Sequence, residues 1–178
     1  MINVITILSY HKTCRYLNMY HNDNIIAMII ISNFVCFTGS SIQYNPVGFS
    51  AYATSDETYA PYESIEFPGI ISNIGDYYDN NTSSFTCPRR AVYIFSLNVL
   101  AQYGYYVHLE LMRDGEFIAE AMCSDGAYSH DQTTSVSVVI ECDAGQVVWV
   151  SSGGNNAFVE GGSSRNSVFT GYMLYPYE

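Results

Sequence analysis

The feature that most constrains this chain is a period of two residues in the apolar side chains between residues 91 and 101. Every odd position is apolar: Ala91, Tyr93, Phe95, Leu97, Val99 and Ala101. The even positions include the polar residues Ser96 and Asn98. Successive side chains of a β-strand point to opposite faces of a sheet, so a repeat of two residues predicts a strand with one buried face.

The next two alternating segments predict a hairpin. Residues 107–111 carry valine and leucine at odd positions, and residues 117–121 repeat the pattern with Phe117 as the first apolar member. Between the segments lies Asp114-Gly115. These two residue types adopt the positive φ angles of a two-residue type I′ turn, which joins antiparallel strands.

Three more segments, at 136–142, 147–150 and 167–175, read as strands, and no convincing helix pattern follows residue 45. Short strands separated by Gly, Asn, Asp and Ser clusters are typical of a β-sandwich, whose two sheets bury one face each. The length suits one such domain after a leader of about 40 residues. We therefore expect an all-β fold.

A set of aromatic and turn-forming residues recurs at fixed places in the first half of this region. Its members are Phe67, Asn73, Tyr78, Phe85, Cys87, Pro88, Tyr93 and Phe95. Their spacing resembles the C1q globular domain of the C1q and tumour-necrosis-factor superfamily, whose motif runs Phe…Asn…Tyr…Phe-x-Cys-Pro-x-x-Gly-x-Tyr-x-Phe. Segments 140–150 and 167–175 also resemble family strands. The resemblance covers about residues 47–175 and implies a ten-stranded jelly-roll β-sandwich.

Two residues depart from the family pattern. Ala91 stands where the family has glycine, and Gln146 stands where it most often has aspartate. We expect the backbone at the first position to tolerate a Cβ, and the turn at the second position to stay polar. Neither change threatens the fold.

An apolar run of 13 residues, 25–37, precedes the domain and is followed by small residues. Such a run is too short to span a bilayer but suits a signal-peptide core, with cleavage near Ser40. An interfacial or buried segment is the alternative. The polar stretch ahead of the run is long, which leaves Met19 and Met28 open as translation starts.

These patterns predict a secreted, extracellular product with three segments and no membrane insertion. They are a leader at 1–40, a short linker at 41–46 and a C1q-like domain at 47–178.

Three cysteines follow the leader, which is an odd number. Cys87 occupies the family's Phe-x-Cys-Pro position, and Cys142 stands where an inward leucine would pack, so both are interpreted as buried thiols. Cys123 lies at a strand end, where it can pair with one of them or remain free.

The charge of the chain excludes some partners. Four arginines, no lysine and 16 acidic residues follow residue 40, which gives that part a formal charge of −12. Nucleic acids and anionic membranes are disfavoured by such a surface. It fits divalent cations or cationic partners, or serves only the solubility of a secreted protein.

Two overlapping glycosylation sequons begin at Asn80 and Asn81. The surrounding segment, residues 76–84, is predicted to be an exposed loop. A glycan at one of these asparagines is therefore expected.

Catalytic motifs are missing from the sequence, so we expect a protein that is not an enzyme. His108 falls on the polar face of a strand and His130 in a loop, where a single histidine is usually a surface side chain. No cofactor is required, although calcium stays open, because some family members bind it near the trimer apex. Asp114 is the residue we would test, and its simpler role is to begin the Asp-Gly turn.

The sequence offers more candidate residues for ligand binding than for catalysis, because the predicted loops combine aromatic, amide and charged side chains. The candidates are Tyr105, Tyr106, Asp125, Tyr128, His130, Asp131, Asn155, Asn156 and Arg165. Tyrosine offers an apolar face and a hydroxyl, which suit sugars and protein epitopes. Arg165 could meet a carboxylated sugar. Tyrosines that fill trimer seams, and glycine-rich loops that merely turn, are the structural alternative.

Assembly and function are implied by the resemblance. It implies a homotrimer or a mixed C1q-like trimer, without a collagen stalk because no Gly-x-y repeat is present. We expect a lectin-like recognition protein of innate immunity that binds glycans or microbial surfaces. The alternatives are a cerebellin-like or cytokine-like ligand for a cell-surface receptor and, third, a matrix component.

Overall fold

The computed structural model describes residues 3–9, 12–21, 24–31, 34–39, 45–123 and 130–177. The chain forms two compact units, Met1–Asn45 and Pro46–Glu178. The first unit is an antiparallel sheet of four strands in chain order. Its strands are β1 (Asn3–Ser9), β2 (Lys12–His21), β3 (Asn24–Ile31) and β4 (Phe34–Gly39).

The apolar run of residues 25–37 contributes to β3 and β4 of this small sheet. Ser40, the expected cleavage position, lies outside the described residues. The signal peptide and the three segment boundaries therefore stay predictions.

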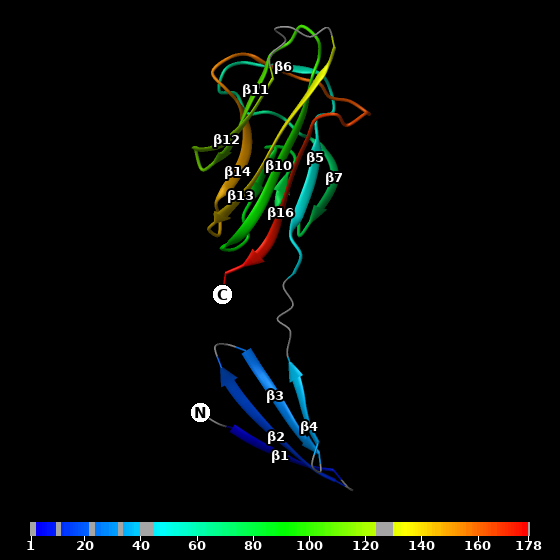
Figure 1. Cartoon of the computed structure of the whole chain (residues 1–178), viewed down its shortest axis with the longest axis vertical. Coiled ribbons are helices and arrows are strands. Elements are labelled where there is room, and N and C mark those ends of the chain that lie inside the picture. Colours follow the sequence, from blue (N-terminus) through cyan, green and yellow to red (C-terminus); the bar gives the residue numbers. More distant parts are fainter. Residues whose placement is uncertain are drawn as a thin grey trace. The chain divides into compact units, whose positions relative to one another are not determined.

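The second unit contains two five-stranded antiparallel sheets and a two-stranded one (Figure 1). The "β10 sheet" has the order β13-β10-β16-β5-β7, the "β11 sheet" has the order β12-β11-β14-β9-β8, and β15 pairs with β6. The strands are β5 (Gly48–Tyr52), β6 (Glu57–Tyr59), β7 (Gly69–Ile74), β8 (Tyr78–Asp79), β9 (Ser84–Thr86), β10 (Ala91–Ala101), β11 (Val107–Arg113), β12 (Glu116–Cys123), β13 (Gln132–Cys142), β14 (Val147–Ser152), β15 (Ala157–Val159) and β16 (Val168–Pro176).

The all-β prediction is confirmed, because the two large sheets form a sandwich of ten strands. All six odd positions of β10 are buried at 3% exposure or less. Within the described residues no segment is helical, and so none forms a helix long and apolar enough to cross a membrane.

The predicted hairpin is also present. Strands β11 and β12 pair around Asp114 and Gly115, whose φ angles are 48° and 84°. Positive φ at both central positions is what a type I′ turn requires. The Asp114 carboxylate accepts a hydrogen bond of 2.9 Å from the backbone N–H of Val147, which ties the turn to β14.

The predicted buried face of β12 is only partly right. Phe117 was expected on the buried face with Ala121, but its exposure is 52%, while Ala121 is buried. The cause is a shift of register between Leu111 and Met112, where β12 contains one extra residue. On one side of such a β-bulge, the side chains point to the opposite face from the one that regular alternation predicts.

Aromatic rings fill the space between the sheets. The Phe49 ring stacks on Tyr78 at 4.4 Å and on Phe85 at 5.1 Å, and Phe169 meets Phe49 edge-on at 4.9 Å. Burial of large aromatic side chains supplies much of the hydrophobic free energy of folding. One core therefore joins residues from both sheets.

Polar members of the family motif stabilise the edge of this core. The Asn73 side chain donates to the Tyr78 carbonyl at 2.8 Å and accepts from the Tyr78 N–H at 3.2 Å. The Tyr78 hydroxyl donates to the carbonyl of Phe67 at 3.0 Å. The spacing of these three residues thus reflects a hydrogen-bonded turn that orients a buried ring.

Candidate functional site

Two of the predicted binding loops meet at one end of the sandwich, away from the C-terminus (Figure 1). The connection between β10 and β11 lies beside β15, because the Tyr106 carbonyl accepts a hydrogen bond of 3.2 Å from the Phe158 N–H. The Tyr105 ring stacks on the Phe158 ring at 4.2 Å. Loops carried by a rigid sandwich can hold side chains at fixed positions.

An open hollow of about 680 Å³ lies at this end of the sandwich. Its lining residues are Pro61, Tyr106, Gly154, Asn155 and Asn156. The structure thus brings together three of the predicted binding residues, which are Tyr106 and the two asparagines. Pro61 and Gly154 were not among the predicted residues, since neither carries a functional group that the sequence could signal.

The other described candidates, Tyr105, His130, Asp131 and Arg165, do not line this hollow. Asp131 accepts a hydrogen bond of 3.0 Å from the Tyr103 N–H and so ties two loops together. Its neighbour His130 is exposed. The Arg165 guanidinium lies over the Tyr52 ring at 4.9 Å, in a cation–π contact. Asp125 and Tyr128 lie outside the described residues.

Asn80 and Asn81, the glycosylation candidates, are exposed in the turn between β8 and β9. The Asn81 side-chain amide donates to Asp79 Oδ1 at 3.1 Å. Both asparagines are placed where a glycan has room, and the modification stays a prediction.

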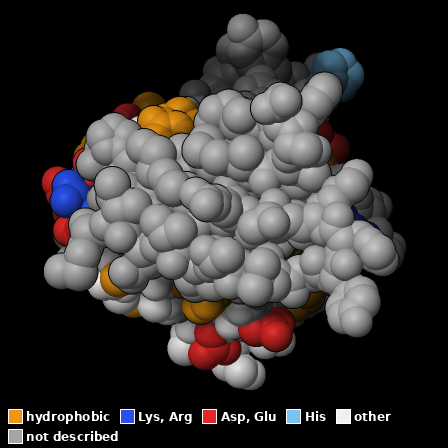
Figure 2. Space-filling view, turned by 90° about the horizontal axis from the view of Figure 1, so that it is seen from below, with side chains coloured by type: hydrophobic (Ala, Val, Ile, Leu, Met, Phe, Trp, Pro, Cys, Tyr) orange, Lys and Arg blue, Asp and Glu red, His pale blue; other side chains and the backbone are white. Residues whose placement is uncertain are grey.

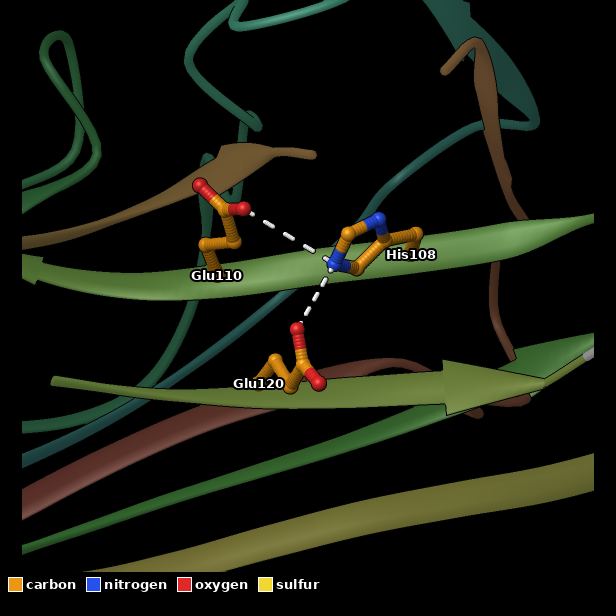
Figure 3. A group of neighbouring side chains, drawn as sticks. All are labelled: His108, Glu110 and Glu120. Carbon is orange, nitrogen blue, oxygen red and sulfur yellow. Dashed lines mark hydrogen bonds and ion pairs between the residues drawn. The ribbon is translucent and has the colours of Figure 1, made fainter. Parts of the chain in front are cut away.

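A cluster that the sequence did not suggest lies on the outward face of the β11 sheet. His108, Glu110 and Glu120, here called the His–Glu cluster, point toward one another from β11 and β12 (Figure 3). His108 Nε2 lies 3.0 Å from Glu120 Oε2 and 3.7 Å from Glu110 Oε1. One ligand atom from each residue lies within 4.8 Å of the others, the only such group among the described residues.

Burial and close packing fix the cluster. The side chains of His108 and Glu110 are only 15% and 18% exposed, whereas that of Glu120 is 46% exposed. The imidazole lies against Gly153, where an added Cβ would come within 2.1 Å of His108 Nδ1. The interpretation of His108 as an ordinary surface histidine is therefore incomplete, because the side chain is largely buried and lies between two glutamates.

Among the described side chains, Cys87, Cys123 and Cys142 are all free thiols. Cys87 and Cys142 are both fully buried, and Cys123 donates from Sγ to Gln132 Oε1 at 2.8 Å. The hydrogen bond with Cys142, together with burial, raises the pKa of the Cys87 thiol. A buried thiol that stays protonated is a poor nucleophile.

The family model of the C1q domain matches residues 48–174, which is most of the chain. The chain belongs to the C1q domain family. The resemblance inferred from the motif is thereby confirmed.

Relatives of this C1q chain include two known proteins of different size. It is 32% identical to caprin-2 of the zebrafish Danio rerio over 133 residues, which cover 72% of this chain and 14% of that protein. It is 28% identical to a complement C1q subcomponent of the rat Rattus norvegicus over 131 residues, which cover 73% of this chain and 51% of that protein. The chain thus spans at most about half the length of these relatives.

Solved structures support the fold. The globular domain of zebrafish complement 1qA protein superposes with a TM-score of 0.60 at 18% identity, covering 74% of this chain and 99% of that one. The Eiger tumour-necrosis factor of S. frugiperda also gives 0.60, at 10% identity, covering 76% and 96%. Identities this low show a shared architecture only.

Membership of the family has three consequences. C1q and tumour-necrosis-factor domains are non-catalytic binding proteins, which confirms the prediction that this chain is not an enzyme. Family members typically form trimers and are generally extracellular. The family is therefore one of binding rather than catalysis.

The outward face of the β10 sheet carries an apolar row. Ile94 pairs with Val139 on one side and with Tyr172 on the other, and the row continues through Gly48 to Ile74. Val139, Tyr172 and Ile74 are 63%, 43% and 50% exposed. Exposed apolar side chains thus lie on three of the five strands in this row, and such patches are typical of surfaces for association.

Acidic groups dominate the charged surface of this C1q chain. Figure 2 shows several acidic side chains and few basic ones among the described residues visible from that side. The formal charge of the whole chain is −11.

Proposed function

We propose that this chain is a secreted C1q-domain recognition protein that binds glycans through the hollow at its loop end. The observation that carries the proposal is the lining of that hollow: one tyrosine, two asparagines, a proline and a glycine. It belongs to a family of binding proteins without catalytic activity. Microbial surfaces, rich in exposed glycans, are the targets that we assign to it in innate immunity.

The lining suits a neutral sugar. Each asparagine amide offers both hydrogen-bond donors and an acceptor, which match the hydroxyl groups of a pyranose ring. The Tyr106 side chain adds an apolar face against which the C–H face of a sugar can pack. Among the residues that the structure describes, no charged side chain lines the hollow, and Arg165 lies elsewhere, on Tyr52. We therefore favour neutral glycans over carboxylated ones.

A homotrimer, or a mixed trimer with other C1q-like chains, completes the proposal. Family members typically form trimers, and the apolar row on the β10 sheet supplies a surface to bury. Three copies would present three hollows on one particle. Weak individual sites gain apparent affinity when several can engage one surface at once.

A glycan array probed with the full-length secreted chain tests this function. We expect saturable binding to neutral glycans that Tyr106→Ala or Asn155→Ala reduces by at least about tenfold, or 1.4 kcal/mol. Tyr103→Ala is the matched control, because Tyr103 is a tyrosine of the same loop, is 62% exposed and does not line the hollow.

Two results would count against glycan recognition. Equal losses in Tyr106→Ala and Tyr103→Ala would show that the hollow is not the binding site. A lack of any glycan signal, together with nanomolar capture of one membrane receptor, would establish the cerebellin-like or cytokine-like alternative.

A further inference from the structure

We propose that the His–Glu cluster binds a zinc-class divalent metal ion on the outward face of the β11 sheet. The three ligands would be His108 Nε2 and one carboxylate oxygen each from Glu110 and Glu120. This inference rests on the geometry of these side chains and is independent of glycan binding.

The distances suit a small ion. Zinc binds imidazole nitrogen and carboxylate oxygen at about 2.0–2.2 Å in tetrahedral geometry, which separates neighbouring ligand atoms by about 3.3 Å. His108 Nε2 lies 3.0 Å from Glu120 Oε2 and 3.7 Å from Glu110 Oε1, on either side of that value. The carboxylate oxygens of Glu110 and Glu120 lie within 4.8 Å of each other, and adjustment of these side chains around the ion would complete three ligand positions. A fourth position remains for water.

Electrostatics favour a cation at this place. Glu110 and Glu120 are direct partners across the β11–β12 ladder, and like charges directly opposite each other destabilise a sheet. The ion pairs that Arg90 and Arg113 form within the described residues go to other carboxylates, at positions 141, 143 and 116. A divalent ion would neutralise both glutamates of the cluster.

The surroundings hold the imidazole in place. Gly153 leaves room for the ring, and its N–H donates to the His108 carbonyl at 2.8 Å. The Tyr106 ring packs edge-on against the imidazole, with centroids 6.2 Å apart. A ligand that is already oriented and largely shielded loses little side-chain entropy when it binds a metal.

The ligand types distinguish this site from a calcium site. Calcium takes six to eight oxygen ligands, whereas imidazole nitrogen is preferred by zinc and its neighbours in the first transition row. Asp114, the residue considered for calcium, belongs to the β11–β12 turn, and its carboxylate accepts a hydrogen bond from the Val147 N–H.

Equilibrium dialysis of the full-length chain against zinc chloride, with metal content measured by mass spectrometry, tests the proposal. We expect His108→Gln and Glu120→Gln each to lose one bound zinc ion per chain relative to the wild type. The comparison between variants is needed because other histidines and cysteines, among them Cys14 and Cys36, can also bind zinc. Calcium chloride should give no difference between wild type and variants.

Glu57→Gln is the matched control, because it removes the same charge from an exposed residue of β6 outside the cluster. Circular dichroism checks that each variant is folded. Glu120→Gln keeps the test decisive if His108→Gln fails to fold, since its side chain is 46% exposed.

Three results would overturn the proposal. Unchanged zinc content in Glu120→Gln would show that the cluster holds no metal. An equal loss in Glu57→Gln would indicate non-specific attraction to an acidic surface. A crystal grown with zinc that shows no anomalous peak between the three side chains would mean that the imidazole simply pairs with the carboxylates.

Discussion

The two sheets of the C1q domain share one inward face and differ on their outward faces. Both contribute aliphatic and aromatic side chains to a single core. Outward, the β10 sheet presents an apolar row that includes Ile94 and Tyr172, whereas the β11 sheet presents the His–Glu cluster. The inward faces therefore determine the fold, and the outward faces differ in chemistry, with an apolar row on one sheet and a charged cluster on the other.

The largest expected effect concerns the shared inward face. Phe169 of β16 is fully buried and its ring contacts Phe49, Phe67 and Phe95. We expect Phe169→Ala to lower the free energy of unfolding by about 3–5 kcal/mol, because it leaves a cavity in the core. Denaturant unfolding followed by the fluorescence of Trp149, the only tryptophan, measures the change.

Phe117→Ala is the control, because it makes the same substitution on the outward face of β12, where Phe117 is 52% exposed. We expect it to change the free energy of unfolding by no more than about 0.5–1 kcal/mol. Equal effects of the two substitutions would mean that the faces of β12 are wrongly assigned.

The position of Phe117 shows how far the sequence could predict the fold. The alternation of β10, the Asp114-Gly115 turn and the family motif sufficed for a jelly-roll sandwich. These patterns did not predict the bulge in β12, because we assumed a regular hairpin.

The bulge, although it was not predicted, does have a signal in the sequence. A two-residue turn pairs Arg113 with Glu116, an odd position with an even one. Apolar residues at odd positions in both strands, such as Leu111 and Ala119, can then share a face only if one strand holds an extra residue. The observed register pairs those two residues, so the mismatch in parity predicts a bulge.

The same bulge sets the register that brings the His–Glu cluster together. His108 and Glu110 are two residues apart on one strand and must share a face. Glu120 joins them only because the bulge shifts β12 by one residue and places it opposite Glu110. The hollow was predicted in part, since Tyr106, Asn155 and Asn156 carry recognisable groups, but proximity between loops is set by tertiary packing.

A smaller effect, on assembly rather than folding, tests the outward face of the β10 sheet. In the proposed trimer, Tyr172→Glu would bring carboxylates into the apolar seam, and burying an unpaired charge is costly. We expect the trimer to dissociate at concentrations at least about tenfold higher than in the wild type. Because the dissociation constant of a trimer scales with the square of concentration, this is about a hundredfold change in that constant, or about 2.8 kcal/mol per trimer. Sedimentation velocity over a dilution series measures it.

Phe117→Glu is the matched control, because it places the same charge on an exposed aromatic of the β11 sheet. This variant should keep the mass of three chains. If Phe117→Glu dissociates the assembly and Tyr172→Glu does not, the roles of the two outward faces are reversed.

The smallest expected effect concerns an exposed ion pair at the β10 sheet, between Arg90 and Glu141. Arg90 donates from Nε to Glu141 Oε1 of β13 at 2.6 Å, and this hydrogen bond lowers the pKa of Glu141. We expect Arg90→Gln to raise that pKa toward the ordinary glutamate value of about 4.3. Carbon-detected NMR titration of the glutamate carboxyl groups follows it, with Arg165→Gln as the control, since Arg165 stacks on Tyr52 instead.

A lowered folded pKa fixes the direction of any effect on stability. The pair stabilises the fold at pH values above the ordinary glutamate pKa, and this contribution disappears as the pH falls through the lowered value. Both side chains are well exposed, at 63% and 42%, so water and salt screen the attraction and the unfolding curves of wild type and Arg90→Gln should nearly coincide at neutral pH. A large loss of stability in Arg90→Gln would show that this edge of the β10 sheet depends on charge, and the contrast between the two outward faces would then be weaker than the apolar row indicates.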